Sequence, residues 1–197
     1  MKFCILSWEF KKEHSYFKTH MNLTEVMPID KVYREAYETG LQMIESGARK
    51  QDILVFLTKS AEKAAGADTV SSILLLDKEG LLRNGASPKL PHDYLKAIDG
   101  LKPDPFVGTC ATAAATGLVV VTEDFSADNK WAELRHLPQS LGFYGAWSTP
   151  ILTDTGKVLG TFGTYFRRKR TPTEAEIKGV KLLASVASLA LLSKSND

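Results

Sequence analysis

Hydrophobic residues recur about every 3.6 positions in two stretches of the N-terminal third of the chain, and this spacing predicts two amphipathic helices. The first runs over 28–46 and the second over 51–65. Gly47 and Gly66 follow the two predicted ends. Glycine commonly closes a helix because it tolerates a positive φ, so both helices are expected to end there.

Short runs rich in apolar and β-branched residues follow, and they predict strands joined by tight turns. Residues 69–76 lead through a turn into 81–83, and residues 143–152 lead through a second turn into 157–166. Residues 118–122 predict one further, buried strand. Because tight turns join antiparallel neighbours, the strands are expected to form an antiparallel sheet.

Three shorter segments, 92–98, 108–117 and 130–141, are compatible with helices. The chain closes on an amphipathic stretch that predicts a last helix, with Thr171 or Thr173 as its cap. The order of elements predicts an α+β fold with one antiparallel sheet, in which the N-terminal and C-terminal helices together cover one face.

The first part of the chain, 1–27, mixes aromatic and charged residues without a clear period, so we expect an arm outside the fold. Residues 28–197 are expected to form a single domain. The whole chain of 197 residues is long enough to bury a core without disulfides or metals.

The charges nearly balance, with 25 Lys and Arg against 23 Asp and Glu and a formal net charge of +2. Such a balance argues against a nucleic-acid binder. Two cysteines are too few for a disulfide framework or a four-cysteine zinc site. No apolar run approaches the roughly 18–20 residues of a membrane span, and no secretory signal is apparent, so we expect a cytoplasmic protein without a membrane span.

Four motifs stand in an informative order: Gly108-Thr-Cys-Ala-Thr112, Ala146-Trp-Ser-Thr-Pro-Ile151, Gly156-Lys-Val-Leu-Gly-Thr-Phe162 and Arg170-Thr-Pro-Thr-Glu174. With them, about residues 46–193 resemble a GAF domain, and more narrowly the bacterial sensor subgroup with a Gly-Thr-Cys start and an Ala-Trp-Ser-x-Pro-Ile strand. The resemblance implies a six-stranded antiparallel sheet with helices behind it and a ligand pocket on the other face.

The resemblance also implies a function. GAF domains bind cyclic nucleotides, bilins, haem, nitrate or amino acids, and the layout here is similar to that of stand-alone nitrate-sensing proteins of two-component systems. We expect a sensor in signal transduction that binds a small anion or polar metabolite, carries no cofactor, is not an enzyme, and signals through a partner such as a sensor kinase. Small residues on the last helix also suit a homodimer.

Two other classes stay open at this stage. One is a redox enzyme of the GAF fold, similar to methionine sulfoxide reductases, which would use Cys110. The other is a protein-interaction module that binds no ligand. Replacing Cys110 with Ser would abolish turnover in the enzyme and leave ligand affinity nearly intact in the sensor.

The helix predicted at 108–117 would begin with unpaired backbone N–H groups, which favour a small anion. Together with the resemblance, this places Gly108, Thr109, Cys110, Ala111 and Thr112 in the expected ligand site. The alternative is that Thr109 only caps the helix, and that the small residues allow close packing on the sheet. Cys110 could then be a small buried apolar group.

Trp131 and Arg135 lie four positions apart and would share one face of the helix predicted at 130–141. There Arg135 could pair with an anion while Trp131 walls the pocket. The alternative places Trp131 in the core and Arg135 in solvent.

Side chains alternate along the strand predicted at 143–152, so Tyr144, Ala146 and Ser148 share one face and Trp147 lies on the other. The sequence leaves open which face lines the pocket. We expect Trp147 to line it with Phe162 at its edge, and Tyr144 to supply a hydroxyl if its own face is the pocket face.

Overall fold

The computed structural model describes residues 30–193, so the expected arm 1–27 lies outside the described residues. Its elements follow one another as α2 (Lys31–Glu45), α3 (Lys50–Ala65), β1 (Thr69–Leu76), β2 (Leu82–Ala86), α4 (His92–Ala97), α5 (Thr109–Thr116), β3 (Val120–Thr122), η1 (Asn129–Trp131), α6 (His136–Ser140), β4 (Gly145–Leu152), β5 (Val158–Phe166) and α7 (Glu174–Leu192). The limits of the single domain expected over 28–197 stay a prediction.

The strands form one sheet in the order β2-β1-β5-β4-β3, and every pair is antiparallel. This confirms the α+β class with one antiparallel sheet. The described residues contain five strands rather than the six that the resemblance implied. Beyond β2, Leu101 makes only a single isolated bridge to Leu82, so the segment after α4 does not extend into a further strand.

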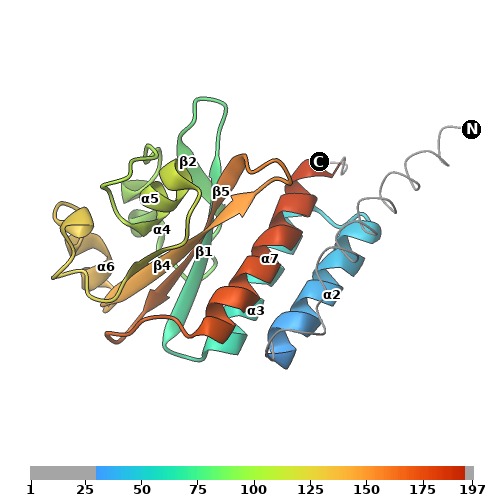
Figure 1. The fold of residues 1–197 in the computed structure, drawn as a ribbon, viewed down its shortest axis with the longest axis horizontal. Coiled ribbons are helices and arrows are strands. Elements are labelled where there is room, and N and C mark those ends of the chain that lie inside the picture. Colours follow the sequence, from blue (N-terminus) through green and yellow to red (C-terminus); the bar gives the residue numbers. More distant parts are fainter. Residues whose placement is uncertain (1–29, 194–197) are drawn as a thin grey trace, which may run out of the picture.

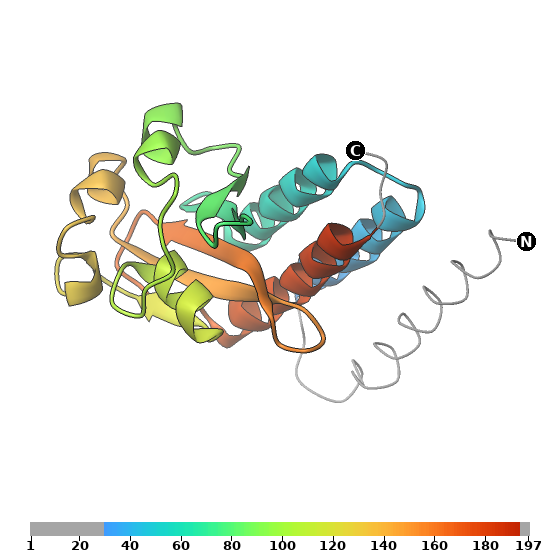
Figure 2. The same cartoon turned by 90° about the horizontal axis from the view of Figure 1, so that it is seen from above.

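Helices α2, α3 and α7 cover one face of the sheet (Figures 1 and 2). Helix α7 packs on β4 and β5, α3 packs on β1 and β2, and α2 lies against α3 and α7. The buried residues on this side include Ile73, Trp147, Phe162 and Phe166, which alternate along their strands with residues of the opposite face. A large apolar core therefore joins the sheet to the terminal helices.

The α7 helix is capped at its start and closely packed at its first turns. Thr173 is the cap: its hydroxyl accepts a hydrogen bond from Glu176 N, and the Glu176 carboxylate accepts one from Thr173 N. One turn further on, Gly179 faces the ring of Tyr33 in α2 so closely that a Cβ at this position would collide with it. A glycine is therefore required where α2 and α7 touch.

The opposite face carries α5, which packs on β3, β4 and β5, and the shorter helices α4 and α6, which contact each other (Figure 1). Ala111 and Ala113 of α5 are completely buried. Their small side chains let the helix lie close to the sheet, in agreement with the packing alternative weighed for this segment.

The helix expected over 130–141 is wrong as a continuous element. The structure has the short turn η1 and then α6, which spans only His136–Ser140. The Asp128 side chain caps η1 by accepting from Lys130 N, and Pro138 lacks an N–H that a longer helix would use. The segment is therefore folded as two short pieces.

Candidate functional site

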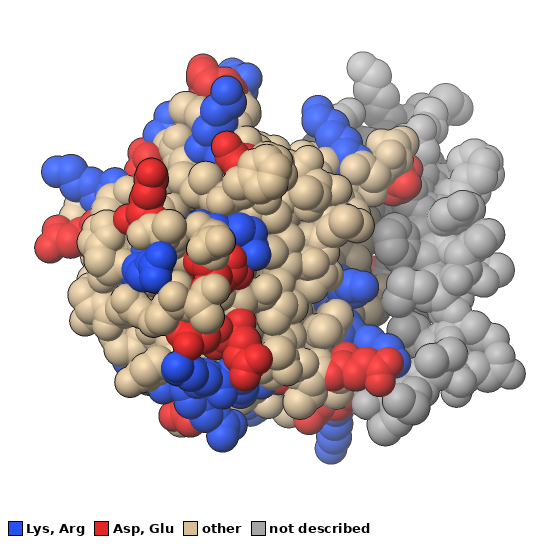
Figure 3. Space-filling model, turned by 60° about the vertical axis from the view of Figure 1, so that its left-hand side comes forward, with Lys and Arg blue, Asp and Glu red and all other residues tan. Residues whose placement is uncertain are grey.

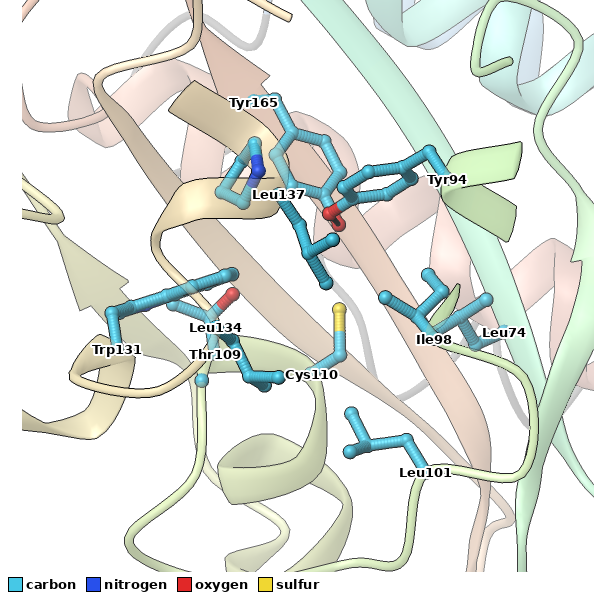
Figure 4. Close-up of a pocket in the computed structure, with 12 residues that line it drawn as sticks. Leu74, Tyr94, Ile98, Leu101, Thr109, Cys110, Trp131, Leu134, Leu137 and Tyr165 are labelled. Atoms are coloured by element: carbon cyan, nitrogen blue, oxygen red, sulfur yellow. Dashed lines mark hydrogen bonds between the residues drawn. The ribbon is translucent and has the colours of Figure 1, made fainter. Parts of the chain in front are cut away.

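A small cavity lies between the sheet and the layer formed by α4, α5 and α6, and we call it the roof cavity (Figure 4). Leu74 of β1 and Tyr165 of β5 form its floor, while the other lining residues come from the segments above the sheet. Most of the lining side chains are apolar: Leu74, Ile98, Leu101, Trp131, Leu134, Leu137 and Pro138. The polar members are Tyr94, Thr109, Cys110 and Tyr165.

The roof cavity is small as it stands. The volume open to the centre of a water-sized sphere is about 20 Å³. A space of about 10–15 Å³ by this measure holds one water molecule. A ligand larger than water therefore requires the layer above the sheet to move outward.

The start of α5 forms one wall of the roof cavity. Gly108 has a φ of 51°, which favours glycine, and it lies next to Trp131: a Cβ here would be in ordinary contact with the indole ring, at 3.6 Å. Gly108 N donates to Lys130 O at 2.7 Å, and no side chain caps the helix. Thr112 is turned away from the cavity, because its hydroxyl donates to Gly108 O at 2.6 Å.

Cys110 points its sulfur into the roof cavity, toward Leu137 and beside Ile98 (Figure 4). The Sγ atom lies 3.1 Å from Ser148 Oγ, and Ser148 in turn donates to Thr109 Oγ1 at 2.9 Å. Burial raises the pKa of the Cys110 thiol, although neighbouring hydroxyls, first that of Ser148, act in the other direction. The group is therefore a neutral thiol at pH 7.

Two tyrosines join α4 to the floor of the roof cavity, and we call them the tyrosine pair. The hydroxyl of Tyr94 donates to the hydroxyl of Tyr165 at 3.0 Å, and their rings meet edge to face with centroids 6.0 Å apart. Burial raises the pKa of both phenols, so both stay protonated at pH 7. This hydrogen bond ties the short helix α4 to the sheet.

Trp131 belongs to the buried core on this side of the sheet and also forms one wall of the cavity. Its Nε1 donates to Thr122 Oγ1 at 3.2 Å, and its ring lies 4.3 Å from that of Phe125, measured between centroids. Thr122 donates to Asp128 at 2.6 Å, so the indole is fixed through β3 and the cap of η1.

Of the residues expected at the ligand site, the structure brings Gly108, Thr109, Cys110 and Trp131 together around the roof cavity. Ala111 and Thr112 follow on the same helix and are buried, but they do not line it. Whether any of these residues binds a ligand stays a prediction.

Four other expected residues lie elsewhere. Trp147 and Phe162 face the helices α3 and α7, so the expectation that they line the pocket is corrected: their face of the sheet is the opposite one. Tyr144 precedes β4 and is 47% exposed. Arg135 lies one helical turn after Trp131, with its N donating to Trp131 O, but its side chain turns outward and donates to Ser126 O at 2.9 Å.

The sequence reasoning missed both members of the tyrosine pair and the leucines of the roof. For Tyr165, the alternation along 157–166 already separated it from Phe162, so a correct choice of face would have found it. Tyr94 and Ile98 carry no comparable signal, since the short helix that holds them has no period long enough to identify a buried face.

Among the described residues, the lining of the roof cavity contains no His, Asp or Glu side chain that could bind a metal ion. Within residues 30–193 there is no group of three or more His, Cys, Asp or Glu side chains that could hold a metal ion.

No helix of the same part of the chain is long and apolar enough to cross a bilayer. On the face shown in Figure 3, basic and acidic side chains are interspersed.

The sequence matches a protein-family model and is similar to a named sensor protein. A family model described as GAF domain matches residues 48–192. A protein named methyl sulfide methyltransferase-associated sensor, from Methanosarcina acetivorans, is 35% identical over 152 residues. The alignment covers 77% of this chain but only 15% of the relative, so the chain spans a small part of that relative's length.

Solved structures share the fold at lower identity. A domain described as part of a two-component sensor histidine kinase from Sinorhizobium meliloti 1021 is 23% identical, with a TM-score of 0.53, over 80% of this chain and 89% of that domain. The fRMsr of Staphylococcus aureus, in its reduced form, is 15% identical, with a TM-score of 0.64, over 85% of this chain and 99% of that protein. At such identities the likeness concerns the fold alone.

Proposed function

Because the chain belongs to the GAF domain family, we propose that it is a sensory domain that binds a small molecule in the roof cavity and signals through a partner protein. The observation that carries the proposal is the position of the cavity. It is enclosed by α4, α5 and α6 above and by β1 and β5 below, and those strands are covered on their other face by the terminal helices.

A short series of contacts links the floor of the cavity to α7. Tyr165 lines the cavity, and the next residue, Phe166, faces the helices. The guanidinium of Arg170 lies 3.8 Å from the centroid of the Phe166 ring and makes two hydrogen bonds, of 2.6 and 2.8 Å, to Glu176. A shift of β5 on ligand binding would therefore change the contacts at the start of α7.

The relatives suggest the kind of partner and one kind of ligand to test. A sensor kinase is the partner class proposed, because the sequence resembles sensory proteins of two-component systems and its relative from Methanosarcina acetivorans is named a sensor. The sensor relative is named for a methyl sulfide methyltransferase, so methyl sulfides join the candidate ligands. A homodimer and a cytoplasmic location belong to the same proposal, and analytical ultracentrifugation of the full chain tests the first of them.

The test is a thermal-shift screen of the full chain against nitrate, nitrite, cyclic nucleotides, amino acids and methyl sulfides. A ligand at about 100 times its Kd should add about 2.7 kcal/mol to the free energy of unfolding, or roughly 5–10 °C to the Tm. Ile98→Phe, which fills the cavity, should abolish this shift, and Leu134→Phe is the substitute if that variant does not fold. Leu152→Phe, at an exposed position, should retain it.

A shift that survives both cavity-filling variants would place the ligand elsewhere. The absence of any shift across the screen would contradict the proposal and favour an interaction module without a ligand.

A redox enzyme is the second candidate, because Cys110 lines the cavity and fRMsr shares the fold. Burial raises the pKa of Cys110, however, and the reactive form of a cysteine is the thiolate. Within residues 30–193 there is no second cysteine to form a disulfide with it. If the chain is a sensor, the Cys110→Ser variant should retain its affinity for the ligand. If the chain instead reduces methionine sulfoxide, and Cys110→Ser abolishes this turnover, the chain is a redox enzyme.

A further inference from the structure

The lining of the roof cavity contains no Asp, Glu, Lys, Arg or His among the described residues. An ion that leaves water for an apolar space loses its hydration, and this loss is costly unless a charged partner or several hydrogen bonds replace it. The composition of the lining therefore bears directly on the charge of the ligand.

The ionisable groups that do reach the cavity are neutral at pH 7. Burial raises the pKa of the Cys110 thiol and of both phenols of the tyrosine pair. Arg135 is the cation expected from the sequence, but it lies outside the cavity and donates a hydrogen bond to Ser126 O. At the start of α5, Gly108 N donates to Lys130 O, so this one of the first N–H groups of the helix is not available to an anion. None of these groups supplies a positive charge to an anion.

Two groups of hydroxyls reach the cavity, that of Thr109 beside Trp131 and those of the tyrosine pair (Figure 4). Thr109 Oγ1 accepts from Ser148, and Tyr165 accepts from Tyr94. One hydrogen bond uses one of the two hydroxyl protons of the tyrosine pair, so the other proton can be donated to an acceptor atom that enters the cavity, and Tyr165 is the member of the pair that also interacts with Cys110. The apolar lining residues, among them Ile98 and Leu101, offer only van der Waals contact.

We infer that the ligand of the roof cavity is an uncharged, mainly apolar molecule of a few heavy atoms, with one hydrogen-bond acceptor directed at the Tyr165 hydroxyl. This inference rests on the proposed function and replaces the small anion expected from the sequence. Since the cavity holds about one water molecule, binding displaces α4 outward, and the hydrogen bond of the tyrosine pair is the contact that must lengthen.

Acetone and acetate provide a matched pair of probes, because they are similar in size and differ in charge. The full chain, with ¹³C-labelled Ile and Leu methyl groups, is titrated separately with acetone, acetate, nitrate and dimethyl sulfide. Acetone and dimethyl sulfide should shift the methyl resonances of the lining residues Ile98, Leu101 and Leu134. Acetate and nitrate should leave them unchanged at the same concentration.

Tyr165→Phe tests the proposed hydrogen bond. The variant should bind acetone about three- to tenfold more weakly, which is the range of one neutral hydrogen bond. Its affinity for dimethyl sulfide should change less, because a thioether sulfur is a weak acceptor. Tyr144→Phe is the matched control, since Tyr144 is exposed and lies outside the cavity. Equal binding of acetone to both variants would overturn the role of Tyr165.

The outcomes separate the inference from the proposed function. Lining methyl groups that respond to acetate or nitrate and not to acetone would overturn the uncharged ligand and leave a sensor that binds anions. No response to any probe, together with no stabilisation in the thermal-shift screen, would overturn the proposed function and the inference with it.

Discussion

The tyrosine pair can be tested by a double-mutant cycle, because its two hydroxyls are buried and hydrogen-bonded to each other at 3.0 Å. Tyr165→Phe leaves the Tyr94 donor without its acceptor, and Tyr94→Phe removes the donor to Tyr165. An unsatisfied buried polar group costs about 1–3 kcal/mol, so each single variant should lose about 1–2 kcal/mol of unfolding free energy.

The double variant should lose no more than either single variant, because removing both partners leaves neither hydroxyl unsatisfied. The expected coupling is therefore at least about 1 kcal/mol, which is above the roughly 0.3–0.5 kcal/mol within which independent sites add. Urea unfolding followed by circular dichroism measures all three variants, with Tyr144→Phe as an exposed control expected to change by less than about 0.5 kcal/mol. Additive losses would refute the coupling between α4 and the sheet.

Three further predictions concern pH and packing. The pKa values of the tyrosine pair are raised in the folded state, so the unfolded chain loses these protons at a lower pH than the folded chain does. The free energy of unfolding should therefore fall above about pH 10, by up to about 1.4 kcal/mol per pH unit for each tyrosine. Urea melts at a series of pH values measure this fall. Burial opposes ionisation of the Glu176 carboxyl, but hydrogen bonds from Arg170 and from the cap residue Thr173 lower its pKa overall. The free energy of unfolding should therefore fall below about pH 4.5, and the Glu176→Gln variant should show a smaller fall. Gly179→Ala should lose roughly 1–3 kcal/mol through collision with Tyr33, and Ser185→Ala on the same helix less than about 0.5 kcal/mol in the same melts.

The fold was largely predictable because its long elements have clear periods. The spacing near 3.6 over 51–65 matches α3, and the apolar runs at 69–76 and 157–166 match β1 and β5 closely. The segment 130–141 was not predictable in the same way. It is too short for a period to separate one helix from a turn followed by a helix, and local capping by Asp128 decides its form.

The candidate site was only partly predictable. The motif beginning at Gly108 and the aromatic Trp131 do border the roof cavity. The choice of face on β4 failed because every residue from Gly145 to Ile151 is buried, by helices on one side and by the roof on the other. Alternation separates the two faces of such a strand but does not say which layer covers each.

The layer above the sheet has an evolutionary consequence. All residues that line the roof cavity, apart from Leu74 and Tyr165, lie in one continuous stretch of sequence between β2 and β4. The terminal helices that would carry the output lie outside this stretch. Under the proposed function, most of the residues that face a ligand would therefore vary within one segment, residues 87–144, while the sheet contributes only Leu74 and Tyr165.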